Sequence, residues 1–327
     1  MLDRRTFMGA VAANLVAVPR VAMGQLTEKV RRIGHLQLGN PPIPAGPDWD
    51  PAPLRDLGWI EGKNLVIEYR YAGDRAELLQ RLAAELVRLN VEIIVTTGTD
   101  AAVAARDATT RIPIVMYSAG DPVGAGLVAR LSRPGGNITG FSILTTELDV
   151  KRLEVLHELL PSVQRVGELV NPTNPISKVG RKEYEEAYRA LGIQPLFIDV
   201  AAASELGNAF AVLARWRAQA LVVPQDNLFV ASSVSIMRAA VAHALPTMVG
   251  SRAMVEDGGM VSYTYSGDER SRRFAYFIDK ILRGARPGDL PIEQPTKFEL
   301  IVNLKTAKAV GITVPQSLLV RADAVIQ

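Results

Sequence analysis

The sequence predicts an α/β protein of two lobes, each built around a doubly wound parallel sheet. Short β-branched runs alternate with amphipathic stretches along most of the chain, an order typical of parallel sheets with right-handed crossovers. A dense run of proline and glycine interrupts this alternation between residues 120 and 137. With 327 residues, 48% of them hydrophobic, the chain can bury two separate cores.

The first half is expected to alternate strands and helices. Leucines recur at helical spacing over 78–89 and give one apolar stripe. Repeated prolines in 39–53 prevent a long helix there, so 54–59 should form at most a helical stub that ends at Gly58. The expected strands are 31–38, 65–71, 91–97 and 112–117, and a second helix is expected at 100–109.

The second half repeats this arrangement. Pro161 ends its first amphipathic helix, and Gly192 separates a charged helix from the next strand. The expected helices are 148–160, 177–191, 205–216, 232–244 and 268–283, and the expected strands are 166–170, 195–200, 221–223, 247–249 and 260–265. The tail is expected to add a strand at 298–303 and a short helix.

Residues 111–142 are interpreted as the crossover between the two lobes. Ligands of open α/β sheets bind beyond the carboxyl ends of the strands, which places Asp121 at the mouth of a cleft. Gly124, Gly126 and Ala129 fit the G-x-G-x-x-A dinucleotide pattern. However, Asp121-Pro122-Val123 separates the strand from the glycines, and Pro134 would break the following helix, so no dinucleotide cofactor is expected.

Composition excludes several classes of function. Lys and Arg total 37 against 34 Asp and Glu, so the chain has no broad basic field and nucleic-acid binding is not expected. Without cysteine there are no disulfides and no thiolate chemistry. Three scattered histidines make a metal site unexpected.

The first 24 residues are interpreted as a twin-arginine export signal. Arg4-Arg5 precede an apolar core at 8–18, which is too short to span a membrane, since a span takes about 20 residues. The small residues Ala22-Met23-Gly24 have the spacing of a cleavage site, so Gln25 is the expected first residue of an exported, periplasmic protein.

Polar side chains collect after the predicted strands of both halves. Each alone fits a helix cap or a turn. Together they occupy the same kind of position in two successive sheets, where a ligand held between two lobes would be bound. The candidate ligand-binding residues are Thr99, Asp100, Asp121, Ser142, Asn171, Asn174, Asp226, Asn227, Ser251 and Arg252.

These residues predict binding of a zwitterion or a small polar acid. Thr99 and Asp100 open a helix whose free N–H groups could receive a carboxylate, and Arg252 could bind the same anion. Asp226 or Asp121 could hold an ammonium group.

No catalytic motif accompanies the binding residues: the sequence contains no G-x-S-x-G elbow, P-loop or H-E-x-x-H. His35, a candidate base in the first strand, is alone, and a lone histidine is more often structural. Asp121 and Asp226 as a glycosidase pair would lack the aromatic platforms that sugars need. We therefore expect neither an enzyme nor a cofactor.

Several motifs spread over nearly the whole chain carry a resemblance to a known family. They are LGWIEGKN at 57–64 with IEYR at 67–70, GDPVGAGLV at 120–128, RPGGNITG at 133–140, NPTNP at 171–175, GGMVSY at 258–263, and LP at 290–291 through QPTKFELIVNLKTAK at 294–308. With these motifs and a twin-arginine leader, the sequence resembles the ABC transporter substrate-binding proteins of the type I periplasmic-binding fold, in the branch related to tryptophan- and tyrosine-type binding proteins.

The resemblance implies two Rossmann-like lobes joined by a three-segment hinge near Gly140, Tyr265 and Gln294. After the signal peptide at 1–24, the first lobe would comprise 27–140 plus 266–293, and the second 141–265 plus 294–327. Ligand contacts would fall on Thr99, Asp100, Asp121, Ser142, Asn171, Asp226 and Asn227.

The resemblance also implies a function. The chain would be a monomeric periplasmic receptor that captures an amino acid, aromatic ones included, or a small organic acid, and presents it to an ABC permease in the inner membrane. The alternative is a receptor that reports its ligand to a signalling partner, and an enzyme of the same lobed shape comes third.

The Pro-rich stretch 40–53 departs from the family pattern. Relatives usually have a Ser-rich ligand loop and a full helix here, so most of the first helix must be lost. Either Trp49 and its neighbours form a different pocket wall, or this lobe is impaired; we expect altered specificity.

Overall fold

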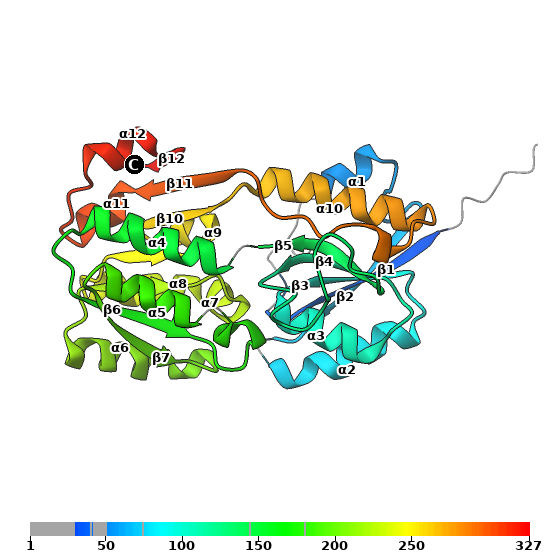
Figure 1. Cartoon of the computed structure of the whole chain (residues 1–327), viewed down its shortest axis with the longest axis horizontal. Helices are drawn as coiled ribbons and strands as arrows, with labels where there is room; N and C mark the ends of the chain where they lie inside the picture. The colour runs from blue at the N-terminus through cyan, green and yellow to red at the C-terminus, as the bar shows by residue number, and fades with distance from the viewer. Residues whose placement is uncertain (1–29, 40, 42–50, 74, 144, 180) are drawn as a thin grey trace, which may run out of the picture.

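The computed structural model describes residues 30–39, 41, 51–73, 75–143, 145–179 and 181–327. Two lobes lie side by side along the long axis of the molecule, each with a sheet covered by helices (Figure 1). The expected leader at 1–24 and most of the Pro-rich stretch, Trp49 included, lie outside the described residues.

The first lobe contains a five-stranded, fully parallel sheet of order β2-β1-β3-β4-β5. Buried β-branched runs form these strands, because both faces of a parallel sheet are covered. Their bounds are β1 (Arg31–Gln37), β2 (Leu65–Tyr71), β3 (Ile93–Thr97), β4 (Ile114–Ala119) and β5 (Ile138–Ser142).

Helices cover both faces of the first sheet. The expected leucine stripe lies on α2 (Leu79–Arg88), which with α3 (Thr99–Ala108) packs on one face. The short α1 (Ala52–Asp56) confirms the predicted stub and packs on the other face beside α10 (Gly267–Leu282). Figure 1 shows α10 above the strands of this lobe, although it follows the last strand of the other lobe's parallel core. Short 3-10 turns lie at Ala76–Leu78 and Pro287–Asp289.

The second lobe contains a seven-stranded mixed sheet of order β12-β11-β10-β9-β8-β6-β7. All neighbours are parallel except β10 and β11, which pair antiparallel. The strands are β6 (Arg165–Val170), β7 (Gln194–Asp199), β8 (Ala220–Val223), β9 (Thr247–Val249), β10 (Val261–Tyr265), β11 (Phe298–Asn303) and β12 (Ala324–Ile326).

Two apolar clusters cover the two faces of this sheet. One face carries α4 (Thr145–Leu159), α5 (Arg181–Ala190), α11 (Leu304–Ala309) and α12 (Gln316–Arg321). The other carries α6 (Leu206–Trp216), α7 (Asn227–Ala231), α8 (Ser233–Ala242) and α9 (Arg252–Glu256). Short 3-10 turns, η2 (Pro175–Lys178) and η3 (Ala203–Glu205), complete the lobe.

Three segments connect the lobes: β5 to α4, β10 to α10, and the stretch before β11 (Figure 1). Backbone hydrogen bonds tie them together, with Ser142 N donating to Glu293 O at 2.8 Å and Ser266 N donating to Lys297 O at 3.0 Å. The fold is therefore the predicted one, with two parallel-sheet lobes joined by a three-segment hinge.

Two strands were not expected from the sequence, β5 and the short β12 at the end of the tail. β5 lies inside the stretch that we interpreted as the crossover, and it forms an edge of the first sheet. Gly140 lies at its centre with φ 128°, and a Cβ there would lie 2.3 Å from the carbonyl oxygen of Met116. A strand that needs a central glycine for close approach to its neighbour is hard to recognise in sequence. The chain consequently leaves the first sheet at Ser142.

Candidate functional site

A cavity of about 610 Å³ lies between the two lobes, at the carboxyl ends of the strands. In the first lobe its walls come from the ends of β1, β3 and β4 and from the starts of α3 and α10. In the second lobe they come from η2, the loop after β8, α7, α9 and the end of β10. We call it the cleft cavity; its size is that of a small-molecule site.

The amino end of α3 forms part of the first-lobe wall. Gly98, with φ 92°, makes the sharp turn from β3 into the helix. The Thr99 hydroxyl oxygen accepts a hydrogen bond from Gly120 N at 2.9 Å, which holds the neighbouring strand end in place. This helix start lines the cavity and directs partial positive charge toward it, and the Asp100 carboxylate already accepts from Ala101 N at 2.7 Å there.

Asp226 is the central acid of the second-lobe wall. It caps α7 by accepting from Leu228 N at 2.9 Å. The side-chain amides of Asn171 and Asn174 donate to its two oxygens at 3.0 and 2.7 Å. Burial raises the pKa of Asp226, although these amide hydrogen bonds oppose the rise. Neutral donors thus hold a buried carboxylate in one orientation, and no cation pairs with it in the described part of the chain.

Asn227 connects the two lobes. Its side-chain nitrogen donates to the carbonyl oxygen of Thr97 at 2.9 Å and lies 3.4 Å from a carboxylate oxygen of Asp100. Burial, and then the charge of Asp226 in the other lobe, raise the pKa of Asp100 from 3.8 to about 7. The lobes are therefore in contact, and two carboxylates from opposite lobes lie near each other.

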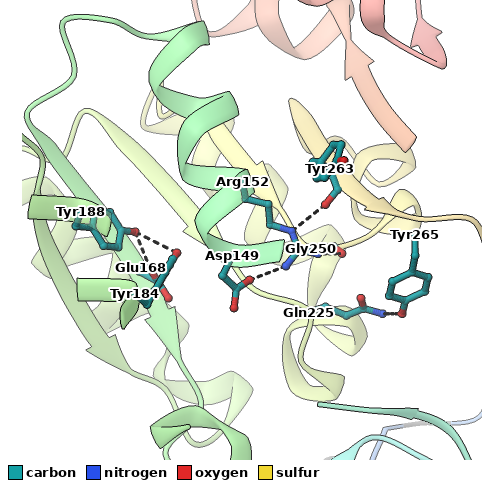
Figure 2. Close-up of polar contacts among 9 residues, drawn as sticks. All are labelled: Asp149, Arg152, Glu168, Tyr184, Tyr188, Gln225, Gly250, Tyr263 and Tyr265. Atoms are coloured by element: carbon teal, nitrogen blue, oxygen red, sulfur yellow. Dashed lines mark hydrogen bonds and ion pairs between the residues drawn. The ribbon is translucent and has the colours of Figure 1, made fainter. Parts of the chain in front are cut away.

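Arg270 brings a cation to the cavity from the first turn of α10. Its guanidinium lies 4.0 Å from the ring centroid of Tyr117 and 4.7 Å from that of Tyr265. It donates to the Tyr265 hydroxyl at 2.6 Å. The Gln225 amide donates to the same hydroxyl at 2.6 Å, and Figure 2 shows this second bond. This group combines charge-assisted and cation–π contacts.

Sequence reasoning missed this arginine and its two tyrosines. Tyr117 and Tyr265 are each the last residue of an expected strand, at 112–117 and 260–265. An aromatic residue at the carboxyl end of a predicted parallel strand was therefore a usable signal. Arg270 lies two residues into a charged helical segment, and nothing in that pattern distinguishes it from its neighbours Arg272 and Arg273.

Most of the predicted residues gather at the cleft. Thr99, Asn174, Asp226, Asn227, Ser251 and Arg252 line the cavity. Asp100 and Asn171 adjoin it through hydrogen bonds to Asn227 and Asp226. Ser251 caps α9, accepting from Met254 N at 3.4 Å. The Arg252 guanidinium is engaged by Glu299 in two contacts, of 2.5 and 3.2 Å, so its charge is already compensated.

The other two predicted residues, Asp121 and Ser142, also lie outside the lining of the cavity. Asp121 accepts from Val123 N at 3.0 Å, the geometry of a turn residue. Ser142 donates to the carbonyl oxygen of Gly120 at 2.8 Å and is fully enclosed at the end of β5. His35 lies within β1, buried, with Nε2 3.2 Å from the hydroxyl of Thr97 and its ring edge-on to Tyr69 and Tyr71.

The described residues contain no group of three or more potential metal ligands. Among them, no helix combines the length and the apolar character needed to cross a bilayer.

The cleft cavity offers an anion site, a buried carboxylate and aromatic rings, an arrangement suited to holding a small charged ligand.

Comparisons with known proteins agree with this geometry. The sequence profile described as ABC transporter substrate binding protein matches residues 52–326. A tyrosine-binding protein of Clostridioides difficile (strain R20291) is 28% identical over 256 residues, which cover 78% of this chain and 73% of that protein. The ABC domain in complex with L-Trp from Streptococcus pneumonia is 26% identical, with a TM-score of 0.81, covering 90% of this chain and 99% of the other.

A third relative is in a different state. The ligand-free, open structure of a substrate binding protein with adhesive properties from Clostridium difficile is 25% identical and covers 91% of this chain and 100% of its own, yet its TM-score is 0.60. Identity and coverage are close to those of the L-Trp complex. The structure resembles the ligand-bound relative more than the open one, and the cross-lobe contacts of Asn227 agree with this.

Proposed function

This chain belongs to the ABC transporter substrate-binding protein family, and on that premise we propose that it captures an amino acid between its lobes for an ABC importer. The family role is binding of a solute and not catalysis. Relatives named for tyrosine binding and solved with L-Trp support an amino acid with a large side chain.

The pattern of charge in the cleft cavity carries the proposal. Asp226 is a buried carboxylate without a cationic partner among the described residues, and it suits an α-ammonium group. The amino end of α3 and the Arg270 guanidinium, both on the first-lobe wall, suit an α-carboxylate. A zwitterion satisfies both walls at once and favours the closed arrangement of the lobes.

Arg270 replaces Arg252 as the proposed anion-binding cation. Arg252 is held by Glu299 and also approaches Glu256 at 3.9 Å. Removing it from Glu299 would leave a carboxylate unpaired, whereas Arg270 already stands between two aromatic rings that line the cavity. We propose Thr99, Asp226, Asn227 and Arg270 as ligand contacts, with Asp100, Asn171 and Asn174 holding them in place.

We place the boundary between the two lobes that move during closure at the three connecting segments. The proposed first lobe is 27–142 plus 266–293 and the second 143–265 plus 294–327; the boundary moves from residue 140, expected from the sequence, to residue 142, because β5 keeps Phe141 and Ser142 in the first sheet. Packing of α10 on the first sheet supports assigning 266–293 to that lobe. Hinge motion about paired segments is the usual mode of closure around a ligand in such proteins.

A comparison of three ligands tests the charge pattern. Thermal shift and calorimetry would be measured on protein starting at Gln25 with L-tyrosine, tyramine, which lacks the carboxylate, and 3-(4-hydroxyphenyl)propionate, which lacks the ammonium group. Only the amino acid should bind well; a ligand at 100 times its Kd stabilises the native state by about 2.7 kcal/mol. Equal binding of the propionate would contradict the ammonium site at Asp226.

Export and delivery are part of the same proposal. We propose that the leader at 1–24 directs the protein to the periplasm, where it meets a permease of the inner membrane. Ligand uptake by proteoliposomes carrying the permease, dependent on added binding protein, tests delivery. Recovery of a signalling receptor in place of a permease by cross-linking in cells would favour the sensory alternative.

A further inference from the structure

A second, smaller cavity of about 90 Å³ opens inside the second lobe, directly behind the cleft. It lies between α4, α5, η2 and the carboxyl end of β6. Since one water needs roughly 10–15 Å³ by this measure, it has room for several waters or for a compact polar group. We call it the side cavity.

The side cavity and the cleft cavity share part of their walls. Ile143, Asn174, Ile176, Gln225 and Asp226 line both. A ligand whose ammonium group lies at Asp226 therefore has the side cavity as its nearest unfilled space. Ile176 also packs against the first lobe, because a Cβ on Gly120 would lie 2.4 Å from it, so closure of the lobes completes the shared wall.

The charged side chains at the inner end of the side cavity differ in how completely they are paired. Arg152 is fully engaged: it pairs with Asp149 at 2.6 Å and donates to the carbonyl oxygens of Tyr263 and Gly250 at 2.9 and 3.0 Å (Figure 2). It therefore holds α4 against the sheet and has little capacity left for a ligand.

Glu168 is less completely paired than Arg152. It lies in β6 with only 6% of its surface exposed, and it accepts a hydrogen bond from the Tyr188 hydroxyl at 2.7 Å (Figure 2). Arg181, the other cation of this wall, pairs with Glu185 at 3.1 Å and lies over the Phe197 ring. In the described part of the chain no cation forms an ion pair with Glu168.

A second acceptor faces the same region. One end of the Gln225 carboxamide is bonded to Tyr265, and the other end, Oε1, is buried without a hydrogen-bond partner among the described residues. A buried acceptor without a donor is costly, and a buried carboxyl group held by the Tyr188 and Tyr184 hydroxyls, with no cation paired to it among the described residues, is costly too. Both costs would be offset by a donor group that enters from the cleft.

We propose that the side cavity is a specificity subsite that takes the far end of the ligand side chain, with Glu168 accepting a hydrogen bond from a hydroxyl or amine there. This inference rests on the proposed amino-acid binding function and adds to it. The ligand would then be an amino acid whose side chain ends in a hydrogen-bond donor, and side chains of the same shape without a donor would be rejected, because they add no donor to the buried Glu168 carboxyl group.

The test compares ligands that differ only at this end. Affinities of L-tyrosine, L-phenylalanine and 4-amino-L-phenylalanine would be measured by calorimetry on wild type and on Glu168→Gln. The wild type should prefer both donor-bearing ligands, and Glu168→Gln should reduce the tyrosine-to-phenylalanine ratio by up to about tenfold, as expected for the loss of one buried hydrogen bond. Comparing the hydroxyl with the amine tells which donor the subsite takes.

Two further variants complete the design. Glu183→Gln changes an exposed glutamate of α5, the helix that carries Tyr184 and Tyr188, and should leave the ratio unchanged. Glu168→Met serves if the glutamine variant does not fold, because it removes the acceptor altogether; the Tyr188 hydroxyl then keeps its 3.5 Å contact with the Tyr184 hydroxyl. A ratio that is the same in wild type and in the Glu168 variants overturns the subsite while leaving the binding function intact; failure of all three ligands to bind overturns both.

Discussion

The side-chain nitrogen of Asn227 donates to the carbonyl oxygen of Thr97 across the cleft, with 2.9 Å between the two atoms. The donor belongs to the second lobe and the acceptor to the carboxyl end of β3 in the first, so this hydrogen bond exists only when the lobes are close. The same amide lies 3.4 Å from Asp100. Asn227 therefore reports directly on closure.

Asn227→Ala should shift the protein toward an open form. The variant loses one hydrogen bond across the cleft, which contributes about 1 kcal/mol, so ligand affinity should fall roughly fivefold. Small-angle scattering of the ligand-free variant should give a larger radius of gyration than the wild type. Asn208→Ala, an exposed change on α6, is the matched control and should alter neither quantity. An unchanged radius and affinity in Asn227→Ala would contradict this role.

Gly98→Ala should disturb both the helix start and the closed state. Gly98 has φ 92°, and a Cβ there would lie 2.2 Å from Nδ2 of Asn227 and 2.6 Å from a carboxylate oxygen of Asp100. The backbone strain alone costs on the order of 1–3 kcal/mol. We expect a lower melting temperature and weaker ligand binding. Gly207→Ala, where nothing lies within 4 Å of the added Cβ, should instead leave binding intact and not lower stability.

The fold could be predicted from sequence because it depends on periodicity. Buried β-branched runs and leucine stripes specify strands and helices locally, and their alternation specifies a parallel sheet. The expected strands at 247–249 and 298–303 coincide with β9 and β11. β5 was missed because its five residues contain Gly140, a residue that weakens a strand pattern. Glycine is needed there because the backbone of Met116, in the neighbouring strand, lies too close for a Cβ. Such a contact has no local signal.

The candidate site was predictable to a smaller extent. Polar residues after strands were brought together at the cleft because carboxyl ends of parallel strands meet there. The side chains that each arginine contacts could not be predicted from the sequence, because Arg252 and Arg270 look alike there. Only the fold places Glu299 beside Arg252 and two tyrosine rings beside Arg270. Glu168 went unnoticed because a single acid in an apolar strand carries no information about the cavity it faces.

Arg270→Gln should weaken amino-acid binding far more than Arg252→Gln. Loss of a charge-assisted bond to the ligand carboxylate should cost tenfold or more in affinity, whereas an exposed pair such as Arg252 with Glu299 contributes about 0–1 kcal/mol to stability and nothing direct to the ligand. Calorimetry with the best amino acid checks this. Tyramine lacks the carboxylate, so any measurable binding of tyramine should be the same in Arg270→Gln as in the wild type. Equal losses in the two variants would contradict the assignment.

Closure of the ligand-free protein should depend on pH through Asp100. Burial and the charge of Asp226 raise its pKa to about 7 in the closed arrangement, above the ordinary value of 3.8. The closed form therefore binds more protons between these values, and its advantage, complete at low pH, is lost as pH rises through about 7. Scattering should give a more open protein at pH 8.5 than at pH 5.5. In Asp100→Asn this dependence should disappear, and its persistence there would point to another group.

Glu168 should make the folded protein less stable as pH rises. Burial raises its pKa from 4.5 to about 8, so the folded state binds more protons than the unfolded state between these values. The stability from this group is complete below about 4.5 and is lost as pH rises through about 8, and the linked loss is on the order of a few kcal/mol at most. Glu168→Gln, which resembles the protonated acid, should melt close to the wild type at pH 5 and above it at pH 8.5 by differential scanning calorimetry.

The exposed change Glu183→Gln should show no such divergence. A Glu168→Gln variant that melts below the wild type at both pH values would mean that Glu168 is held as an anion by the fold itself, which would also remove its need for a ligand donor.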